Sequence, residues 1–328
     1  MLSKAASDEP ERPTDALRAL CEAEPAFAER YTGWRQIGRG ASSAVVATRL
    51  RFTDTPVALK LLWGDARRRL LDAEARALMQ VTHPCVMRTH AIFPGRSVDW
   101  IELELVEGPT LAAALRSRQG AAWPLERALD IGACLAEGLA AVHQAGFVHR
   151  DLKPSNVLLP EDAQPAAKLV DFGIARELDD TFDTAESLPG SAGSLSPEAL
   201  HGAPAGRPGD VYALGLILFQ LLSGRHPYGF DDRTTVAQML VSHERCRPAS
   251  LRALAPGVPP EVSDIVQRAL AKLPAHRPTA AQLAMVLHGA HWEPPADQPA
   301  PFWADTGVLL VLAALAATTV WLIVAASR

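Results

Sequence analysis

The sequence is poor in cysteine and has no excess of positive charge. Its 328 residues include four cysteines without a C-x-x-C pair, and the formal net charge is −5. This spacing suggests neither a zinc site nor a disulfide framework. We therefore expect the four cysteines to be ordinary small apolar residues of a protein in a reducing cytosol. Because no broad basic surface is indicated, nucleic-acid binding is not expected. The four cysteines are Cys21, Cys85, Cys134 and Cys246.

The amino terminus lacks the apolar core of a signal peptide. Acidic residues follow soon after the first four residues, at Asp8, Glu9 and Glu11. Residues 1–30 are polar and acidic and contain several prolines. We therefore expect a loosely ordered arm without chemistry of its own, in which Asp15–Ala23 can form a short helix.

One long apolar run does occur, close to the carboxyl terminus. Gly307–Ala326 contains no charged residue and is bounded by Asp305 and Arg328. As a helix it would be about 30 Å long, which matches the hydrocarbon core of a bilayer, and Trp303 and Trp321 suit the interfaces. We expect a single transmembrane helix; the alternative is a buried carboxyl-terminal helix.

The segment Val148–Leu159 places an acid, a base and an amide at fixed spacing between apolar flanks. The flanks are typical of short buried strands, and Pro154 prevents a helix between them. A loop held in this way can direct Asp151, Lys153 and Asn156 toward one point. The spacing resembles the catalytic loop of protein kinases, H-R-D-L-x-x-x-N.

Two further segments support this resemblance and occur in the same order as in the family. Val57–Lys60 resembles the V-A-I-K strand, and Asp171–Gly173 resembles D-F-G. Lys60 lies among apolar residues, where an unpaired ammonium group would be costly. The family pairs this lysine with the ATP phosphates and with a glutamate of helix C, and Glu74 fits that role better than its rival, Asp72.

A glycine-containing turn precedes these motifs. Gly38–Val46 resembles the glycine-rich loop, G-x-G-x-x-G-x-V, whose backbone N–H groups approach phosphate oxygens closely. It departs from the pattern at the third glycine, where Ser43 stands. Trp100–Gly108 resembles the fifth strand and the hinge, with Leu103 as the gatekeeper. The resemblance implies an ATP site formed by Ile37, Gly38, Gly40, Val45, Ala58, Lys60, Glu74, Leu103, Glu104, Val106 and Leu158.

Phosphoryl transfer requires positioning and charge neutralisation more than covalent chemistry. The resemblance makes Asp151 the residue that accepts the proton of the substrate hydroxyl, and Lys153 the residue that neutralises the γ-phosphate. A lysine at this place is typical of serine/threonine kinases rather than tyrosine kinases. Asn156 and Asp171 would hold Mg²⁺ through oxygen atoms, with Mn²⁺ as an alternative metal.

Arg150 precedes the catalytic aspartate. In kinases with this arginine, a phosphate on the activation loop pairs with it and orders the loop. We therefore expect autophosphorylation of Thr181 or Thr184. The resemblance also implies a buried structural ion pair between Glu198 and Arg277.

The larger lobe is expected to be helical. Pro124 stands where a helix with an apolar face begins, and Asp210–Leu222 is apolar nearly all round, which indicates a buried helix. Asp210 resembles the aspartate that anchors the catalytic loop. Gly190–Glu198 resembles the segment that docks the substrate peptide, although Ser194 replaces its usual tyrosine.

The residues and the resemblance together predict an α+β protein with the two-lobed protein-kinase fold, plus one carboxyl-terminal transmembrane helix. The N-lobe would be rich in strands and contain helix C, and the C-lobe would be helical. This order is similar to that of the membrane-anchored bacterial serine/threonine kinases. The predicted parts are a polar arm (1–30), the N-lobe (31–108), the C-lobe (109–288), a proline-rich juxtamembrane linker (289–306) and the membrane helix (307–326).

The predicted function is a serine/threonine protein kinase that uses ATP and phosphorylates protein hydroxyls, its own activation loop included. We expect it at the cell membrane, with the kinase domain in the cytoplasm and the carboxyl terminus outside. A homodimer is a family-level expectation. Two alternatives are a membrane-anchored pseudokinase scaffold, which the intact catalytic residues disfavour, and a small-molecule kinase of the same fold, which Lys153 disfavours.

Overall fold

The computed structural model describes a large part of the chain. The described residues are 14–40, 43–64, 79, 81–162, 164–171, 192–201, 206–231 and 233–289. The chain divides into two units, residues 1–290 and 291–328, and all described residues belong to the first. Within them, no helix is both long and apolar enough to cross a lipid bilayer. Predictions that lie outside the described residues concern Glu74, Thr181, Thr184 and the membrane helix over 307–326.

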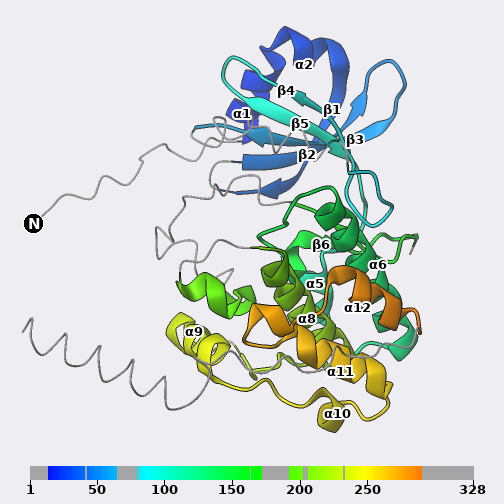
Figure 1. The fold of residues 1–328 in the computed structure, drawn as a ribbon. Helices are drawn as coiled ribbons and strands as arrows, with labels where there is room; N and C mark the ends of the chain where they lie inside the picture. The colour runs from blue at the N-terminus through cyan, green and yellow to red at the C-terminus, as the bar shows by residue number, and fades with distance from the viewer. Residues whose placement is uncertain are drawn as a thin grey trace, which may run out of the picture. The chain divides into compact units, whose positions relative to one another are not determined.

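An antiparallel sheet of five strands forms the N-lobe, in the order β1-β2-β3-β5-β4 (Figure 1). Its register places Val45 opposite Lys60, and Ala58 opposite Leu103. Since facing residues of paired strands share one side of a sheet and alternate along each strand, these four side chains lie on the same face. The strands are β1 (Tyr31–Arg39), β2 (Ser43–Leu50), β3 (Pro56–Leu62), β4 (Thr89–Phe93) and β5 (Asp99–Glu104).

Two short helices, α1 (Thr14–Glu22) and α2 (Pro25–Arg30), precede the sheet and cover its other face; we call them the N-terminal cap (Figure 1). Leu17, Cys21 and Phe27 are buried against residues of β2, β3 and β5. α1 confirms the expected short helix. The expectation of a loosely ordered arm is wrong for residues 14–30, because a sheet with two apolar faces needs a layer on each.

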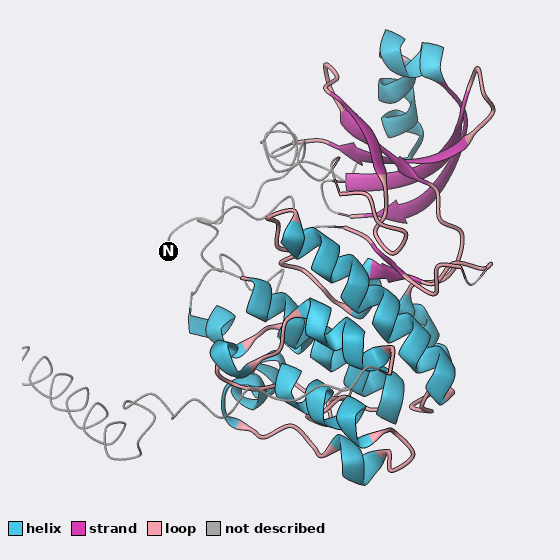
Figure 2. Cartoon of the chain, turned by 45° about the vertical axis from the view of Figure 1, so that its right-hand side comes forward, coloured by secondary structure: helices cyan, strands magenta, loops and turns pink. Residues whose placement is uncertain are grey.

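The C-lobe is helical, as predicted, and Figure 2 shows its helices separated from the strands of the N-lobe. α6 (Leu125–Gln144) follows Pro124 directly and buries Ile131 and Leu135. α8 (Arg207–Ser223) is buried on nearly all sides, as its uniform apolarity predicted. The remaining helices are α5 (Leu111–Ser117), η1 (Pro154–Asn156), η2 (Ala192–Ser194), η3 (Pro197–His201), α9 (Val236–Arg245), α10 (Leu251–Leu254), α11 (Pro260–Ala269), η4 (Pro274–His276) and α12 (Ala280–Leu287).

Two of the four cysteines are joined by a disulfide, Cys85–Cys134, whose Cα atoms lie 5.6 Å apart. The expectation that all four are ordinary apolar residues is therefore wrong. The pair is separated by 49 residues in the sequence, and only the packing of the loop before β4 on α6 brings the two sulfurs together. Of the other cysteines, Cys21 is buried and Cys246 is exposed.

Candidate active site

A buried carboxylate fixes the backbone of the catalytic loop just after α6 ends. Asp210, in the first turn of α8, accepts the backbone N–H of His149 at 2.7 Å and that of Arg150 at 2.8 Å. His143 Nε2 lies 2.9 Å from the same carboxylate. Arg150 has a φ of 65°, which is costly for a residue other than glycine. Asp210 thus holds a strained turn and fixes the direction of the chain at Asp151.

Asp151, Lys153 and Asn156 contact one another directly. Lys153 Nζ lies 2.8 Å from Asp151 Oδ2. Asn156 Nδ2 donates to the backbone carbonyl of Asp151 at 2.8 Å and to Asp151 Oδ2 at 3.0 Å. The single turn of η1 produces this arrangement, because it returns the chain toward Asp151 after Pro154. The Asp151 and Lys153 side chains stay 22% and 20% exposed, so a substrate hydroxyl can reach them.

Lys60 and Asp171 form an ion pair across 111 residues of sequence, with Nζ 2.5 Å from Oδ1. The short strands β6 (Val157–Leu158) and β7 (Lys168–Leu169) lead to this contact. The N–H of Val170 donates to the carbonyl of Asn156 at 3.0 Å, which places Asp171 beside Asn156. The expected pairing of Lys60 with the helix-C glutamate lies outside the described residues and stays a prediction.

The donor atoms of Asn156 and Asp171 suit Mg²⁺. This ion prefers oxygen ligands and is commonly bound through one or two carboxylates, with water and phosphate completing its shell. Asp171 offers a carboxylate that is 47% exposed. Asn156 uses Nδ2 to bind Asp151, so its amide oxygen is the atom that it can offer to a cation. The residues present therefore fit the predicted metal.

The glycine-containing turn closes without its third glycine. Gly38 pairs with Val45 in the β1–β2 register, and the N–H of Gly40 donates to the carbonyl of Ser43 at 2.7 Å. Ile37 is 43% exposed, on the strand that leads into the turn. The serine at the third glycine position is therefore compatible with the turn that the resemblance implies.

The hinge is fixed at both ends. Gly108 has a φ of 141°, and a Cβ there would clash with the carbonyl of Leu159, so a glycine is required. At the other end, the N–H of Glu104 donates to the carbonyl of Arg88 at 3.0 Å, and its carboxylate binds Lys168 Nζ at 2.6 Å. An adenine contact through Glu104 would therefore use its carbonyl. Sequence reasoning missed Lys168, although a lysine between apolar residues just before D-F-G signals a buried partner.

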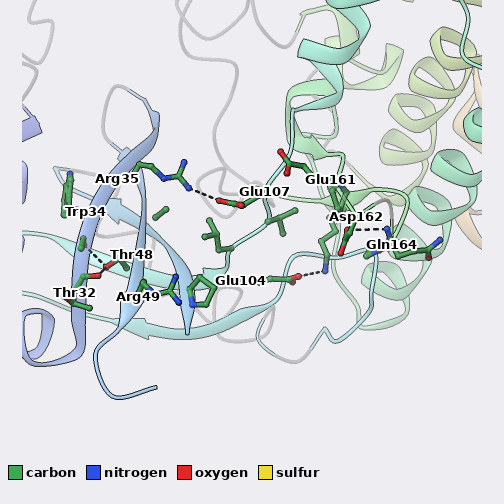
Figure 3. Close-up of a pocket in the computed structure, with 18 residues that line it drawn as sticks. Thr32, Trp34, Arg35, Thr48, Arg49, Glu104, Glu107, Glu161, Asp162 and Gln164 are labelled. Atoms are coloured by element: carbon green, nitrogen blue, oxygen red, sulfur yellow. Dashed lines mark hydrogen bonds and ion pairs between the residues drawn. The ribbon is translucent and has the colours of Figure 1, made fainter. Parts of the chain in front are cut away.

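A pocket of about 680 Å³ lies beside the hinge, between the first two strands and the loop before β7 (Figure 3). Of the predicted nucleotide contacts, Glu104 and Val106 line it, whereas none of the predicted phosphate- and metal-binding residues does. Its wall includes an exposed ion pair, Arg35–Glu107 at 3.0 Å. We therefore define the candidate site by the convergence of the catalytic side chains rather than by this pocket.

Glu198 and Arg277 form the expected ion pair. Both guanidinium NH groups donate to the Glu198 carboxylate at 2.7 Å, and Arg277 also donates to the carbonyl of Pro208 at 2.9 Å. Burial raises the pKa of the Glu198 carboxyl, but the hydrogen bonds and charge of Arg277 outweigh it, so the pKa lies below its ordinary value. The pair fastens the end of the predicted peptide-docking segment to the helical lobe.

The chain has a sheet lobe and a helical lobe. Asp151, Lys153, Asn156 and Asp171 converge near Lys60 of β3. Together these features define the class of protein kinases. The chain belongs to the protein kinase domain family, which matches residues 31–287. The match begins after the N-terminal cap, which is thus an addition to the family's common domain.

The chain is 30% identical over 254 residues to the probable serine/threonine-protein kinase CPE1738 of Clostridium perfringens, covering 76% of this chain and 36% of that protein. It is 34% identical over 254 residues to the serine/threonine-protein kinase PrkC of Bacillus subtilis, covering 76% and 38%. The chain thus spans less than two-fifths of the length of these curated relatives.

A solved structure has the same fold. The kinase domain of Mycobacterium tuberculosis PknI, in a cysteine-to-alanine mutant, has 26% sequence identity and a TM-score of 0.58. The match covers 79% of this chain and 96% of that chain.

Proposed function

We propose that this chain is a serine/threonine protein kinase that transfers the γ-phosphate of ATP to serine and threonine hydroxyls of proteins. The observation that carries the proposal is the contact of Asp151 with Lys153 and Asn156 beside the Lys60–Asp171 ion pair. The names of the relatives support the serine/threonine class. Lys153, which binds the catalytic base Asp151, also supports it, because the resemblance associates a lysine at this place with serine/threonine kinases.

In the proposed reaction, the chain positions the reactants and neutralises charge. Asp151 accepts the proton of the substrate hydroxyl as its oxygen attacks the γ-phosphorus, and ADP leaves. Lys153 neutralises charge on the transferred phosphoryl group, and Lys60 binds the α- and β-phosphates. Mg²⁺, when held by Asn156 and Asp171, would supply further neutralisation of the phosphates. The Lys60–Asp171 pair must then open, because each partner has a new ligand.

A kinase assay on the full chain in detergent tests this proposal. Wild type is compared with Lys60→Met and Asp151→Asn, using labelled ATP and Mg²⁺. Asp264→Asn, on the exposed face of α11, is the matched control for loss of a carboxylate. We expect label on serine or threonine in wild type and control, and at least about 100-fold less in Asp151→Asn. Wild type that binds ATP without transferring phosphate would favour the pseudokinase scaffold.

We also infer a membrane tether, autophosphorylation and a homodimer. The uncharged run Gly307–Ala326 supports the tether. Arg150, which precedes the catalytic base, supports autophosphorylation of Thr181 or Thr184. The dimer rests on the resemblance alone.

Fractionation tests the tether: the full chain should stay in membranes washed with alkaline carbonate, and a chain without 307–326 should be released. Phosphopeptide mapping of active enzyme tests the two threonines, and sedimentation tests the dimer.

A further inference from the structure

The Cys85–Cys134 disulfide joins the loop before β4 to α6. The Cα–Cα distance of 5.6 Å lies within the usual range for a disulfide. Both residues are buried, with 4% and 6% of their surface exposed. The bond therefore connects a loop that belongs to the N-lobe with a helix of the C-lobe, inside the protein.

Cys134 has a second partner within reach. Its sulfur lies 2.9 Å from the carbonyl oxygen of Ala167, the residue before β7. A thiol can donate a hydrogen bond to this oxygen, whereas a disulfide sulfur has no proton to donate. The site therefore offers Cys134 a partner in either redox state: Cys85 when oxidised and the Ala167 carbonyl when reduced.

Backbone hydrogen bonds connect the cysteine pair to the strand before the metal-binding candidate. The N–H of Leu169 donates to the carbonyl of Cys85 at 2.8 Å, and the N–H of Met87 donates to the carbonyl of Leu169 at 2.9 Å. Leu169 ends β7, two residues before Asp171. Two hydrogen bonds and a short stretch of chain therefore connect the Cys85 loop to Asp171, so a displacement of the loop can reach Asp171.

The Cys85 loop and α6 approach each other closely beside the pair. Gly138 follows Cys134 by one turn of α6, and a Cβ there would lie 3.0 Å from the carbonyl oxygen of Cys85 and 3.2 Å from the side chains of Leu169 and Val86. Reduction removes the covalent link between the loop and α6, so that the two elements can move relative to each other.

We propose that Cys85 and Cys134 form a reversible redox modification site whose state sets the position of Asp171 and thereby the affinity for Mg²⁺–ATP. The proposal rests on the proposed kinase function, which assigns Asp171 to the metal. Disulfides inside cells are usually redox-sensing or catalytic rather than permanent. This arrangement of two buried thiols behind a metal site fits the redox-sensing kind.

The oxidant we name is a low-molecular-weight disulfide, such as glutathione disulfide. One protein thiolate attacks it, releases one small thiol and forms a mixed disulfide; the second protein thiolate then displaces the second small thiol. The protein loses two electrons and two protons, and the small disulfide gains them as two thiols. A dithiol such as dithiothreitol reverses both steps.

The remaining cysteines provide internal controls. Burial, and after it the charges of Glu24 and Glu22, raises the pKa of the Cys21 thiol to about 12. Cys21 is a free cysteine in the structure and little of it is thiolate, the reactive form, so it serves as the control for a buried thiol outside the pair. Cys246 is exposed and is the competing site for oxidation.

The first experiment detects the cross-link in the full chain. Protein in detergent is treated with glutathione disulfide or, under native conditions, with dithiothreitol, then denatured, alkylated and digested for mass spectrometry. We expect a linked Cys85–Cys134 peptide after oxidation, its loss after dithiothreitol, and alkylated Cys21 in both samples. Alkylation of both partners after oxidation, or a link that resists native reduction, would overturn the proposal.

The second experiment measures thermal unfolding and Mg²⁺–ATP binding. Neither requires phosphate transfer, so failure of the redox proposal can be told apart from failure of the kinase proposal. Oxidised wild type should unfold about 5–10 °C above reduced wild type and bind Mg²⁺–ATP about tenfold more tightly. Cys85→Ser and Cys134→Ser should match reduced wild type, and Cys246→Ser should match wild type. Equal affinity of oxidised and reduced wild type would reject the proposal, even if a variant fails to fold.

Discussion

Arg30 donates two hydrogen bonds to the buried carboxylate of Glu102, at 2.8 Å from Nε and 3.2 Å from Nη2. Tyr31 donates a third from its hydroxyl at 2.7 Å. Burial raises the pKa of Glu102, but the bonds from Arg30 and Tyr31 outweigh it and hold the pKa below its ordinary value. Because Glu102 lies on β5 two residues before the hinge begins, this pair ties the N-terminal cap to the strand that leads into the hinge.

Loss of the arginine should therefore destabilise the N-lobe. Arg30→Met leaves a carboxylate whose side chain is 4% exposed without its cation, and we expect unfolding to become easier by about 2–3 kcal/mol, measured by urea denaturation. Arg18→Met removes an exposed pair in α1 and should change stability by less than about 0.5 kcal/mol. Equal effects of the two variants would show that the cap is not held by this pair.

Acid should destabilise the helical lobe through its buried histidines, His226 and His243 among them. Burial lowers the pKa of His226 to about 4 and that of His243 to about 3, against 6.5 for an ordinary histidine. Below pH 6.5 the unfolded chain therefore binds more protons at these imidazoles than the folded chain does. Stability is complete above pH 6.5 and falls as the pH drops toward 4 and 3. We expect a loss of roughly 2 kcal/mol per imidazole between pH 6.5 and 5.

Denaturation at several pH values checks this slope. His226→Gln should reduce the loss between pH 6.5 and 5, and the rest comes from His243 and from His149, whose pKa burial also lowers. The control is His201→Gln, since the His201 side chain is 65% exposed, and it should leave the slope unchanged. A slope that stays the same in His226→Gln would contradict the assignment.

The anchor of the catalytic loop should matter for both rate and stability. Asp210→Asn leaves one of two backbone N–H groups without an acceptor, so we expect stability to fall by about 1–3 kcal/mol. The strained turn at Arg150 then loses its restraint, and kcat should fall about 100-fold as Asp151 shifts. Asp130→Asn, on the exposed side of α6, should retain full rate. Wild-type kcat in Asp210→Asn would contradict the anchoring role.

Replacing Arg277 by lysine should destabilise the fold, because Arg277 binds Glu198 through two hydrogen bonds. Arg277→Lys keeps the charge but loses the fork that binds Glu198 and the backbone carbonyls. We expect a loss of about 2–4 kcal/mol in the free energy of unfolding. Arg252→Lys, in an exposed pair with Asp264, should cost less than about 0.5 kcal/mol. Calorimetry of both variants measures their free energies of unfolding.

The sequence by itself determined the two-lobed fold and the membership of the candidate site. Asp151, Lys153 and Asn156 lie within six residues, and phosphate chemistry restricts each to few residue types, so a local pattern carries the information. The same holds for α8, since a helix that is apolar nearly all round has only one stable environment, the interior.

Only the tertiary structure decided which distant groups meet. Lys60 contacts Asp171 across 111 residues, Cys85 bonds Cys134, and Glu104 takes Lys168 as its partner. The packing of the N-terminal cap on the sheet was missed for the same reason: a short helix gains its stability from the surface that it covers, and that surface exists only once the strands have paired. The sequence indicates that a buried charge or thiol needs a partner, but only the packing determines which residue is that partner.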